Sequence, residues 1–193
     1  MEVVEQVRGE IFEHYGVDAA GVDSASVTFL GLAPIEILRI VRGDLVHYLT
    51  LGASRQPMGD PSELLADPER GPRGELVLTL RFGAGSTTGL AKSLGVLAAA
   101  PAVEGVVLQP DALLDVSESL WHGAPFTAVL LGPSELPEVV LPEPADPVRY
   151  FAVTPVTATE AAWVRVRGAD ALREAWSEAG IDVHDPARGA ASL

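Results

Sequence analysis

The sequence predicts an α+β fold with a mixed, largely antiparallel β-sheet that is flanked by helices. Two observations indicate this fold: apolar residues recur at helical spacing near both ends of the chain, and short β-type runs separated by turn residues fill the middle. The chain has 193 residues, 48% of them hydrophobic, which is enough for one ordinary domain with a substantial core. We expect a single domain over residues 1–183 and a frayed tail over residues 184–193.

The first half of the chain predicts one helix followed by strands. Apolar residues recur at helical spacing over Val3–Tyr15, and Gly16 is placed to end that helix. Gly43 and Asp44 separate two β-rich runs and predict a hairpin turn. Residues 75–82 alternate apolar with other residues, as in a strand with one buried face. The other expected strands cover residues 27–30, 35–41 and 45–51.

The second half predicts a helix, further strands and a helical end. The helix near Leu90 is expected to end near Pro101, because proline interrupts helical hydrogen bonding. Thr157 and Glu160 have the spacing of a capping box, and the helix that follows could break at Gly168. The expected strands are residues 106–108, as a strand or a sheet edge, residues 126–131, as a central strand, and residues 150–154.

A long connection follows the strand over residues 45–51. Residues 53–74 carry four prolines and show no pattern of a strand or a long helix. A connection of this length inside a compact domain is usually either functional or disordered. It is therefore the first place to look for a binding function.

Composition narrows the classes of partner. The formal net charge is −14, which repels nucleic acid and anionic membrane surfaces. The same charge favours encounter with a basic partner, although solubility alone also explains an acidic chain. The most apolar stretch, residues 94–108, is too short to span a bilayer, and Pro101 and Glu104 interrupt it. Residues 1–15 are acidic and amphipathic, unlike a signal peptide, so we expect a cytoplasmic protein.

No pattern in the sequence predicts catalysis, a metal site or a cofactor. The chain contains no cysteine, and its four histidines lack the spacing of metal ligands. The segment Gly83–Gly89 lies between a strand and a helix, as a phosphate-binding turn does, but its spacing is one residue too long. Small-ligand or nucleotide binding there is a remote alternative, and Thr87 or Thr88 is expected to cap the helix. Trp121 fits either the core or the wall of a surface cleft.

Three stretches together resemble the Suppressor of Fused domain family. The motif Tyr-x-Thr-x-Gly-x-Ser over residues 48–54 resembles the family's strand that opens a loop on the binding side. Residues 75–81 resemble its Glu-Leu-Thr-hydrophobic-Arg strand, and residues 151–160 resemble its closing strand and the Thr-x-x-Glu start of a helix. The stretches occur in the family's order and span most of the chain.

The resemblance implies an α/β sandwich of that domain type, with a binding role and no catalysis. The chain most resembles the short bacterial members that consist of this domain alone. Animal members hold a transcription-factor peptide, partly by strand pairing, with the help of an additional C-terminal domain that we do not expect in this chain. Bacterial members have been proposed as immunity proteins that neutralise toxins.

Two functions follow as alternatives. One is an immunity-type protein whose acidic surface captures a basic toxin, and the other is a peptide-binding adaptor that accepts a strand at a sheet edge. The sequence leaves the oligomeric state open. A methionine beside proline in a polar loop indicates an apolar contact with a partner, unless Met58 packs onto the sheet instead. The expected partner contacts follow Gly52 and are Ser54, Arg55, Gln56, Pro57, Met58 and Asp60.

Overall fold

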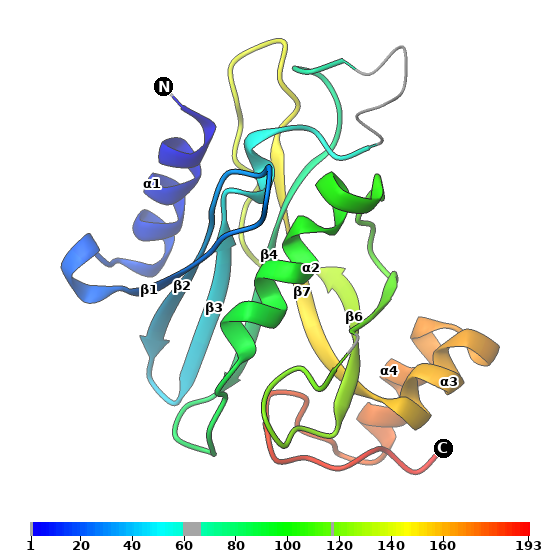
Figure 1. Cartoon of the computed structure of the whole chain (residues 1–193). Coiled ribbons are helices and arrows are strands. Elements are labelled where there is room, and N and C mark those ends of the chain that lie inside the picture. The colour runs from blue at the N-terminus through cyan, green and yellow to red at the C-terminus, as the bar shows by residue number, and fades with distance from the viewer. Residues whose placement is uncertain (1, 60–66, 117) are drawn as a thin grey trace.

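The computed structural model of the chain describes residues 2–59, 67–116 and 118–193 (Figure 1). A seven-stranded sheet forms its centre, with the strand order β1-β2-β3-β4-β7-β6-β5. None of the helices within those ranges is long and apolar enough to cross a membrane. The elements are α1 (Val3–Tyr15), β1 (Asp23–Val27), β2 (Ile35–Arg42), β3 (Leu45–Leu51), β4 (Arg73–Arg81), α2 (Leu90–Glu104), β5 (Leu113–Asp115), β6 (Phe126–Pro133), β7 (Val148–Thr157), α3 (Ala158–Arg167) and α4 (Ala169–Glu178).

The sheet consists of two antiparallel parts joined by one parallel pair. Strands β1, β2, β3 and β4 pair antiparallel in chain order, and the predicted hairpin turn at Gly43 joins β2 to β3 with a φ of +58°. Strands β7, β6 and β5 also pair antiparallel. The two parts meet where β4 and β7 run parallel, with Leu76 opposite Phe151. This arrangement confirms the mixed, largely antiparallel sheet that the sequence predicts.

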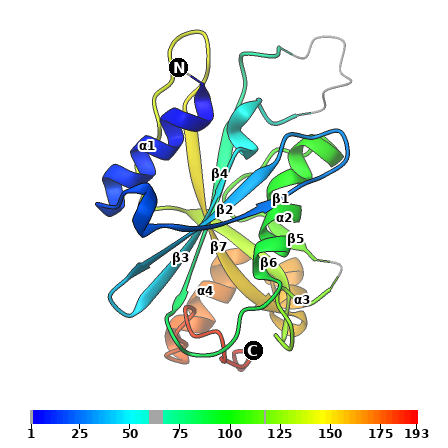
Figure 2. The ribbon, with the colours of Figure 1, turned by 60° about the vertical axis from the view of Figure 1, so that its left-hand side comes forward.

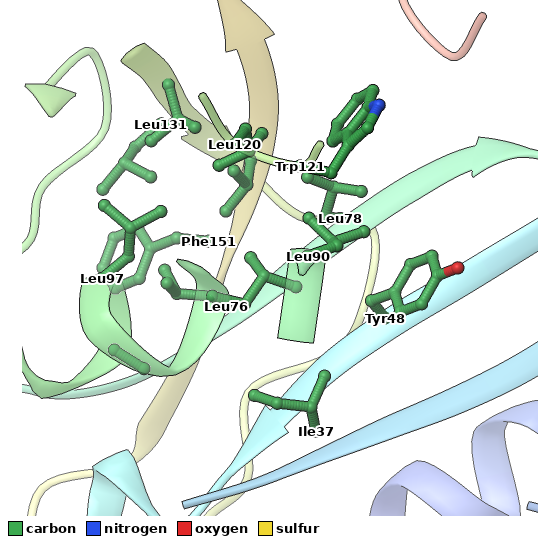
Figure 3. Close-up of a cluster of buried hydrophobic side chains, with 14 of the residues drawn as sticks. Ile37, Tyr48, Leu76, Leu78, Leu90, Leu97, Leu120, Trp121, Leu131 and Phe151 are labelled. Atoms are coloured by element: carbon green, nitrogen blue, oxygen red, sulfur yellow. The ribbon is translucent and has the colours of Figure 1, made fainter. Parts of the chain in front are cut away.

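Helices cover both faces of the sheet. On one face, α2 packs over a cluster that includes Leu76, Leu78 and Phe151 (Figure 3). On the other face, α1 packs near β2 and β3, while α3 and α4 pack near β6 and β7 (Figure 2). Strand β4 lies between these layers, so Leu76 is 0% and Val77 5% exposed. The prediction of one exposed face for this strand is wrong over residues 73–78, where both faces are buried, and only Thr79 and Arg81 are half-buried.

Some boundaries differ from the predictions. Strand β1 lies at Asp23–Val27 and not at residues 27–30, and the strand that precedes β6 lies at Leu113–Asp115 and not at residues 106–108. Helix α2 continues past Pro101 to Glu104. Proline removes only one helical hydrogen bond near the end of this helix, and Pro101 is itself buried in the structure.

The C-terminal region is anchored to the sheet layer. The predicted capping box is present, since the Thr157 side chain accepts from the Glu160 backbone and the Glu160 side chain accepts from the Thr157 backbone. Gly168, with a φ of +88°, separates α3 from α4. The sequence predicts fraying from residue 184 on, whereas in the structure Arg188 and Ala191 are buried and donate hydrogen bonds to Glu160.

Candidate functional site

The chain turns sharply where β3 ends. Gly52 has a φ of +118°, a backbone conformation that glycine adopts without strain, and residues Ala53–Arg55 form a single 3-10 turn. A Cβ atom at Gly52 would lie 2.7 Å from Arg55 Nη1 and 3.2 Å from the Pro34 carbonyl oxygen. The residue that opens this loop is therefore restricted to glycine by both conformation and space.

A buried carboxylate on β4 holds the start of the loop. Glu75 is 0% exposed, and its Oε1 accepts hydrogen bonds from Gly52 N, Ser54 N and Ser54 Oγ at 2.8, 3.0 and 2.6 Å. Its Oε2 accepts from Thr50 Oγ1 at 2.7 Å. Four donors converge on one side chain, which satisfies a carboxylate that can only accept. Within the described residues no arginine or lysine forms an ion pair with Glu75.

A buried arginine two residues earlier on β4 holds the other side of the same loop. Arg73 is 4% exposed, and its Nη1 donates to the carbonyl oxygens of Ser54 and Arg55 at 2.9 and 2.8 Å. Its Nη2 donates to the Glu69 carbonyl oxygen at 3.0 Å, which ties in the far end of the connection. Burial lowers the pKa of the Arg73 guanidinium, although its ordinary value is so high that the group stays charged. Ser54 is thus held on its N–H and hydroxyl side by Glu75 and on its carbonyl side by Arg73.

A cleft of about 310 Å³ opens beside this loop. Its walls come from the loop, the turn between β1 and β2, and the second half of α2. Small residues such as Ala98 and Ala102 line α2 there, and the Arg55 guanidinium donates to the Pro34 carbonyl oxygen at 2.6 Å to join two of the walls. Leu30, which precedes the lining residue Gly31, is fully exposed. The cleft has the shape and chemistry to accept an apolar side chain of another molecule.

The expected contact residues have different surroundings. The side chains of Ser54 and Met58 are buried, and Met58 Sδ accepts a hydrogen bond from Leu108 N at 3.4 Å, so Met58 packs inside the fold. Arg55, Gln56 and Pro57 line the cleft, and Gln56 is exposed. Asp60 lies outside the described residues. Of the expected contact residues in the described part of the chain, Arg55, Gln56 and Pro57 are therefore the ones that line the cleft without being buried.

The residues that hold the loop are absent from the expected contact set. Arg73 and Glu75 stand at alternate positions at the start of a strand that continues with the apolar Leu76, Val77 and Leu78. They lie on the same face of that strand, because side chains alternate along a strand. Charged residues at alternate positions of a buried strand were the available signal, since a buried charge needs hydrogen-bonding partners.

The glycine-rich segment adopts a different arrangement from the expected one. Gly83, Gly85 and Gly89 have positive φ, and Gly89 caps α2 without a side-chain hydrogen bond. Thr87, one of the two expected caps, instead shares a hydrogen bond with the Tyr48 hydroxyl at 3.0 Å. A cavity of about 550 Å³ lies beside the start of α2, and the buried Trp121 forms part of its wall.

In a chain without cysteine, the side chains that could hold a metal ion are those of histidine and the carboxylates. No group of three or more histidine, aspartate or glutamate side chains in these ranges has the arrangement of a metal site. His47 is half-buried on β3, with its Nδ1 2.9 Å from Thr79 Oγ1, as expected of a hydrogen-bonded histidine at the sheet.

Comparisons with known proteins agree with this architecture. The profile of the family described as Suppressor of fused protein matches residues 31–189. A Suppressor of fused homologue from Neisseria gonorrhoeae FA 1090 superposes with a TM-score of 0.66 and 17% identity, over 98% of this chain and 96% of that one. Comparison with curated proteins gives no significant match.

Two further structures share the fold. The crystal structure of the Sufu–Fu complex contains a chain with a TM-score of 0.63 and 16% identity, over 93% of this chain and 84% of that one. Drosophila Suppressor of Fused gives a TM-score of 0.57 and 14% identity, over 97% of this chain but only 50% of that one. At these identities the structures establish a common fold, and this chain spans half the length of the Drosophila protein.

Proposed function

The chain belongs to the Suppressor of fused protein family, and from this premise we propose that it is a non-enzymatic protein-binding domain whose partner is a basic protein. A member of the family forms a complex in the Sufu–Fu structure, which supports a protein partner. An immunity-type role, in which the partner is a toxin that this chain neutralises, is the specific form of the proposal.

The observation that carries the proposal is the loop held by Arg73 and Glu75. Two buried charged side chains fix the backbone of Ser54, and their burial is costly unless hydrogen bonds compensate it. The result is a rigid rim of Arg55, Gln56 and Pro57 on the cleft. A rim that is ordered before binding loses little conformational entropy when a partner docks.

Charge supports a basic partner. The net charge of −14 produces a negative field around the protein, and such a field raises the association rate of a positively charged protein. Arg55 is the cation at the cleft rim, so the negative charge of the protein acts mainly by raising the association rate of a basic partner. The cleft itself supplies shape-complementary contacts.

Capture at two salt concentrations tests the proposal. The tagged chain is incubated with lysate of its own host at low and high salt, and bound proteins are identified by mass spectrometry. We expect one basic protein in stoichiometric amount that is lost at high salt, because salt screens exposed charges. The absence of any protein partner at both salt concentrations would contradict the proposal.

A matched pair of variants then locates the interface. Gln56→Lys adds a positive charge at the cleft rim, and Val166→Lys adds the same charge on α3, at a position that is 79% exposed. We expect Gln56→Lys to weaken binding of the captured partner about tenfold and Val166→Lys to change it far less, because contact charges matter more than net charge. Equal effects of the two variants would remove the cleft from the interface.

A second candidate function rests on the edge of the sheet. β1 pairs with β2 on one side only, and its five residues are exposed or half-exposed. A strand of this kind can accept an extended peptide by backbone hydrogen bonds, as in an adaptor. Binding of that kind changes little with salt, so a salt-resistant partner with an extended segment would favour the adaptor over capture of a basic protein.

A further inference from the structure

The face of the sheet opposite α2 is covered unevenly. Helix α1 packs on one side of this face and helices α3 and α4 pack on the other (Figure 2). A cavity of about 350 Å³ lies here. Its floor includes His47, Thr79 and Thr154, which are only half-buried although they stand on inner strands.

Three of the four histidines line this cavity. His14 comes from the end of α1, His47 from β3, and His184 from the segment after α4. The Tyr15 ring lies between two of them, with its centroid 4.9 Å from those of His14 and His47. Histidines that are far apart in the sequence therefore meet on one surface of the fold.

Thr79 orients two of the histidine rings. His47 Nδ1 lies 2.9 Å from Thr79 Oγ1, and His184 Nδ1 lies 3.0 Å from the Thr79 carbonyl oxygen. A carbonyl oxygen only accepts, so His184 Nδ1 carries a hydrogen, and the proton that charges this ring is added at Nε2. Protonation turns the rings from mixed donor–acceptors into cations that donate through both nitrogens.

We propose that this cavity is a second binding site, which takes a small oxyanion, a carboxylate or a phosphate, when its histidines are protonated. Imidazolium cations and hydroxyl groups are the donors that such an anion needs. The cavity supplies both, since Tyr15, Thr154 and Ser134 line it together with the histidines.

The surrounding charges favour an anion at acidic pH. Burial lowers the pKa of His47, and the nearby His184, His14 and Arg42 lower it further. His47 thus resists protonation while its neighbours are charged, and a bound anion relieves that repulsion. Burial, together with Glu135, raises the pKa of Tyr15 to about 12, so Tyr15 remains a neutral hydroxyl donor.

Acidic groups next to the cavity weaken its attraction for an anion. Glu135, from the connection between β6 and β7, is the acid that lines the cavity. Asp182, beside His184, is paired with Arg81 and accepts a hydrogen bond from His184 N. The anion therefore competes with one lining carboxylate, and removal of that carboxylate should tighten binding.

The site goes beyond the proposed protein-binding function. Its lining shares no residue with the cleft beside Arg55. Purified protein and simple salts suffice to test it, so the result does not depend on the identity or existence of a protein partner.

Histidine titration by NMR is the direct experiment. The four imidazole resonances of the full chain are followed between about pH 5 and pH 8 in chloride, in phosphate and in acetate at equal ionic strength. We expect phosphate or acetate to raise the pKa of His47 by about half a unit or more, because a bound anion favours the charged ring. The larger shift identifies phosphate or a carboxylate as the preferred ligand, and equal titration in all three salts would overturn the proposal.

Three variants sharpen the result. His47→Gln should weaken anion binding because a cationic donor is lost, and Glu135→Gln should tighten anion binding about threefold because a repulsive charge is lost. His122→Gln is the matched control, since His122 lines the other cavity beside α2. If His47→Gln unfolds, Glu135→Gln still decides: tighter binding supports the site, and weaker or unchanged binding contradicts it.

Discussion

Two glutamates in the described part of the chain are fully buried, and each holds a segment that lies outside the strands. Glu75 holds the loop after β3 with neutral donors, namely two backbone N–H groups and two hydroxyls. Glu160 holds the C-terminal segment with a cation, because Arg188 Nη1 donates to its Oε1 at 2.9 Å and Arg188 Nη2 to its Oε2 at 3.1 Å. Trp176 Nε1 and Ala191 N complete the donors to Oε1.

The difference in donors indicates different roles for the two glutamates: Glu160 fixes the C-terminal segment, and Glu75 fixes the loop beside the cleft. A carboxylate matched by an arginine carries no net charge into the core, so Glu160 serves mainly to fix the chain end. A buried carboxylate matched only by dipoles favours the one loop conformation that points four donors at it. That requirement selects a single shape for the rim of the cleft.

The largest loss of stability is expected when Glu160, the glutamate paired with Arg188, is changed. Glu160→Gln leaves the Arg188 guanidinium buried without its carboxylate, and breaking one partner of a buried pair costs about 3–5 kcal/mol. Urea unfolding should show this loss of the free energy of unfolding. Glu174→Gln on the exposed surface of α4 is the control and should change stability by less than about 0.5 kcal/mol.

A smaller and more local effect is expected at the loop anchor. Glu75→Gln replaces one accepting oxygen by a donor, so one of the four hydrogen bonds is lost, at a cost of about 1–3 kcal/mol. Hydrogen exchange at the amides of Gly52 and Ser54 should accelerate more than exchange at the amides of α4. Uniform acceleration over the whole chain would mean that Glu75 supports the fold in general and not the loop.

The glycine that opens the loop gives a matched comparison. Gly52→Ala forces a positive φ on alanine and brings its Cβ against Arg55 and Pro34, whereas Gly31→Ala, also at positive φ, meets open space. We expect Gly52→Ala to cost about 1–2 kcal/mol more than Gly31→Ala, because only the former adds a collision to the conformational strain. Thermal unfolding of the two variants measures the difference, and equal losses would show that the loop yields to the added methyl group.

The smallest effect is expected from acid, which should weaken the contribution of Glu160 to the free energy of unfolding. Burial by itself raises the pKa of Glu160, but the hydrogen bonds from Arg188, Thr157, Trp176 and Ala191 outweigh it and leave the pKa below its ordinary value. A lowered pKa adds stability that is present above about pH 4.3 and is lost as the pH falls through the folded-state value. Glu160→Gln should therefore have a flatter stability curve than the parent between about pH 3 and pH 5. Parallel curves would mean that Glu160 titrates alike in the folded and unfolded chain.

The sequence predicts what depends on near neighbours. The capping box of Thr157 and Glu160 spans three residues and is present as predicted. The helix over Val3–Tyr15 and the hairpin at Gly43 are likewise local patterns and are confirmed. Each of these features is set by spacing along one element, which the amino-acid order displays directly.

The sequence does not predict features that depend on distant residues. The donors to Glu75 lie 21 to 25 residues earlier in the chain, and Arg188 lies 28 residues after Glu160. The three histidines of the cavity come from opposite ends of the sequence, so their spacing gives no sign of a cluster. Which buried charge meets which donor follows from the strand order, and that order is a property of the folded chain.

The parallel pair of β4 and β7 has a consequence for synthesis. When the ribosome has delivered the first hundred residues, β1 to β4 can already pair, but β4 presents an unpaired edge with one apolar face, formed by Leu76, Leu78 and Leu80. Its partner, Val148–Thr157, emerges several seconds later at ordinary translation rates. The nascent chain therefore passes through an interval in which a partly apolar strand edge is unpaired. A chaperone or a second nascent chain would bind this edge most readily during that interval.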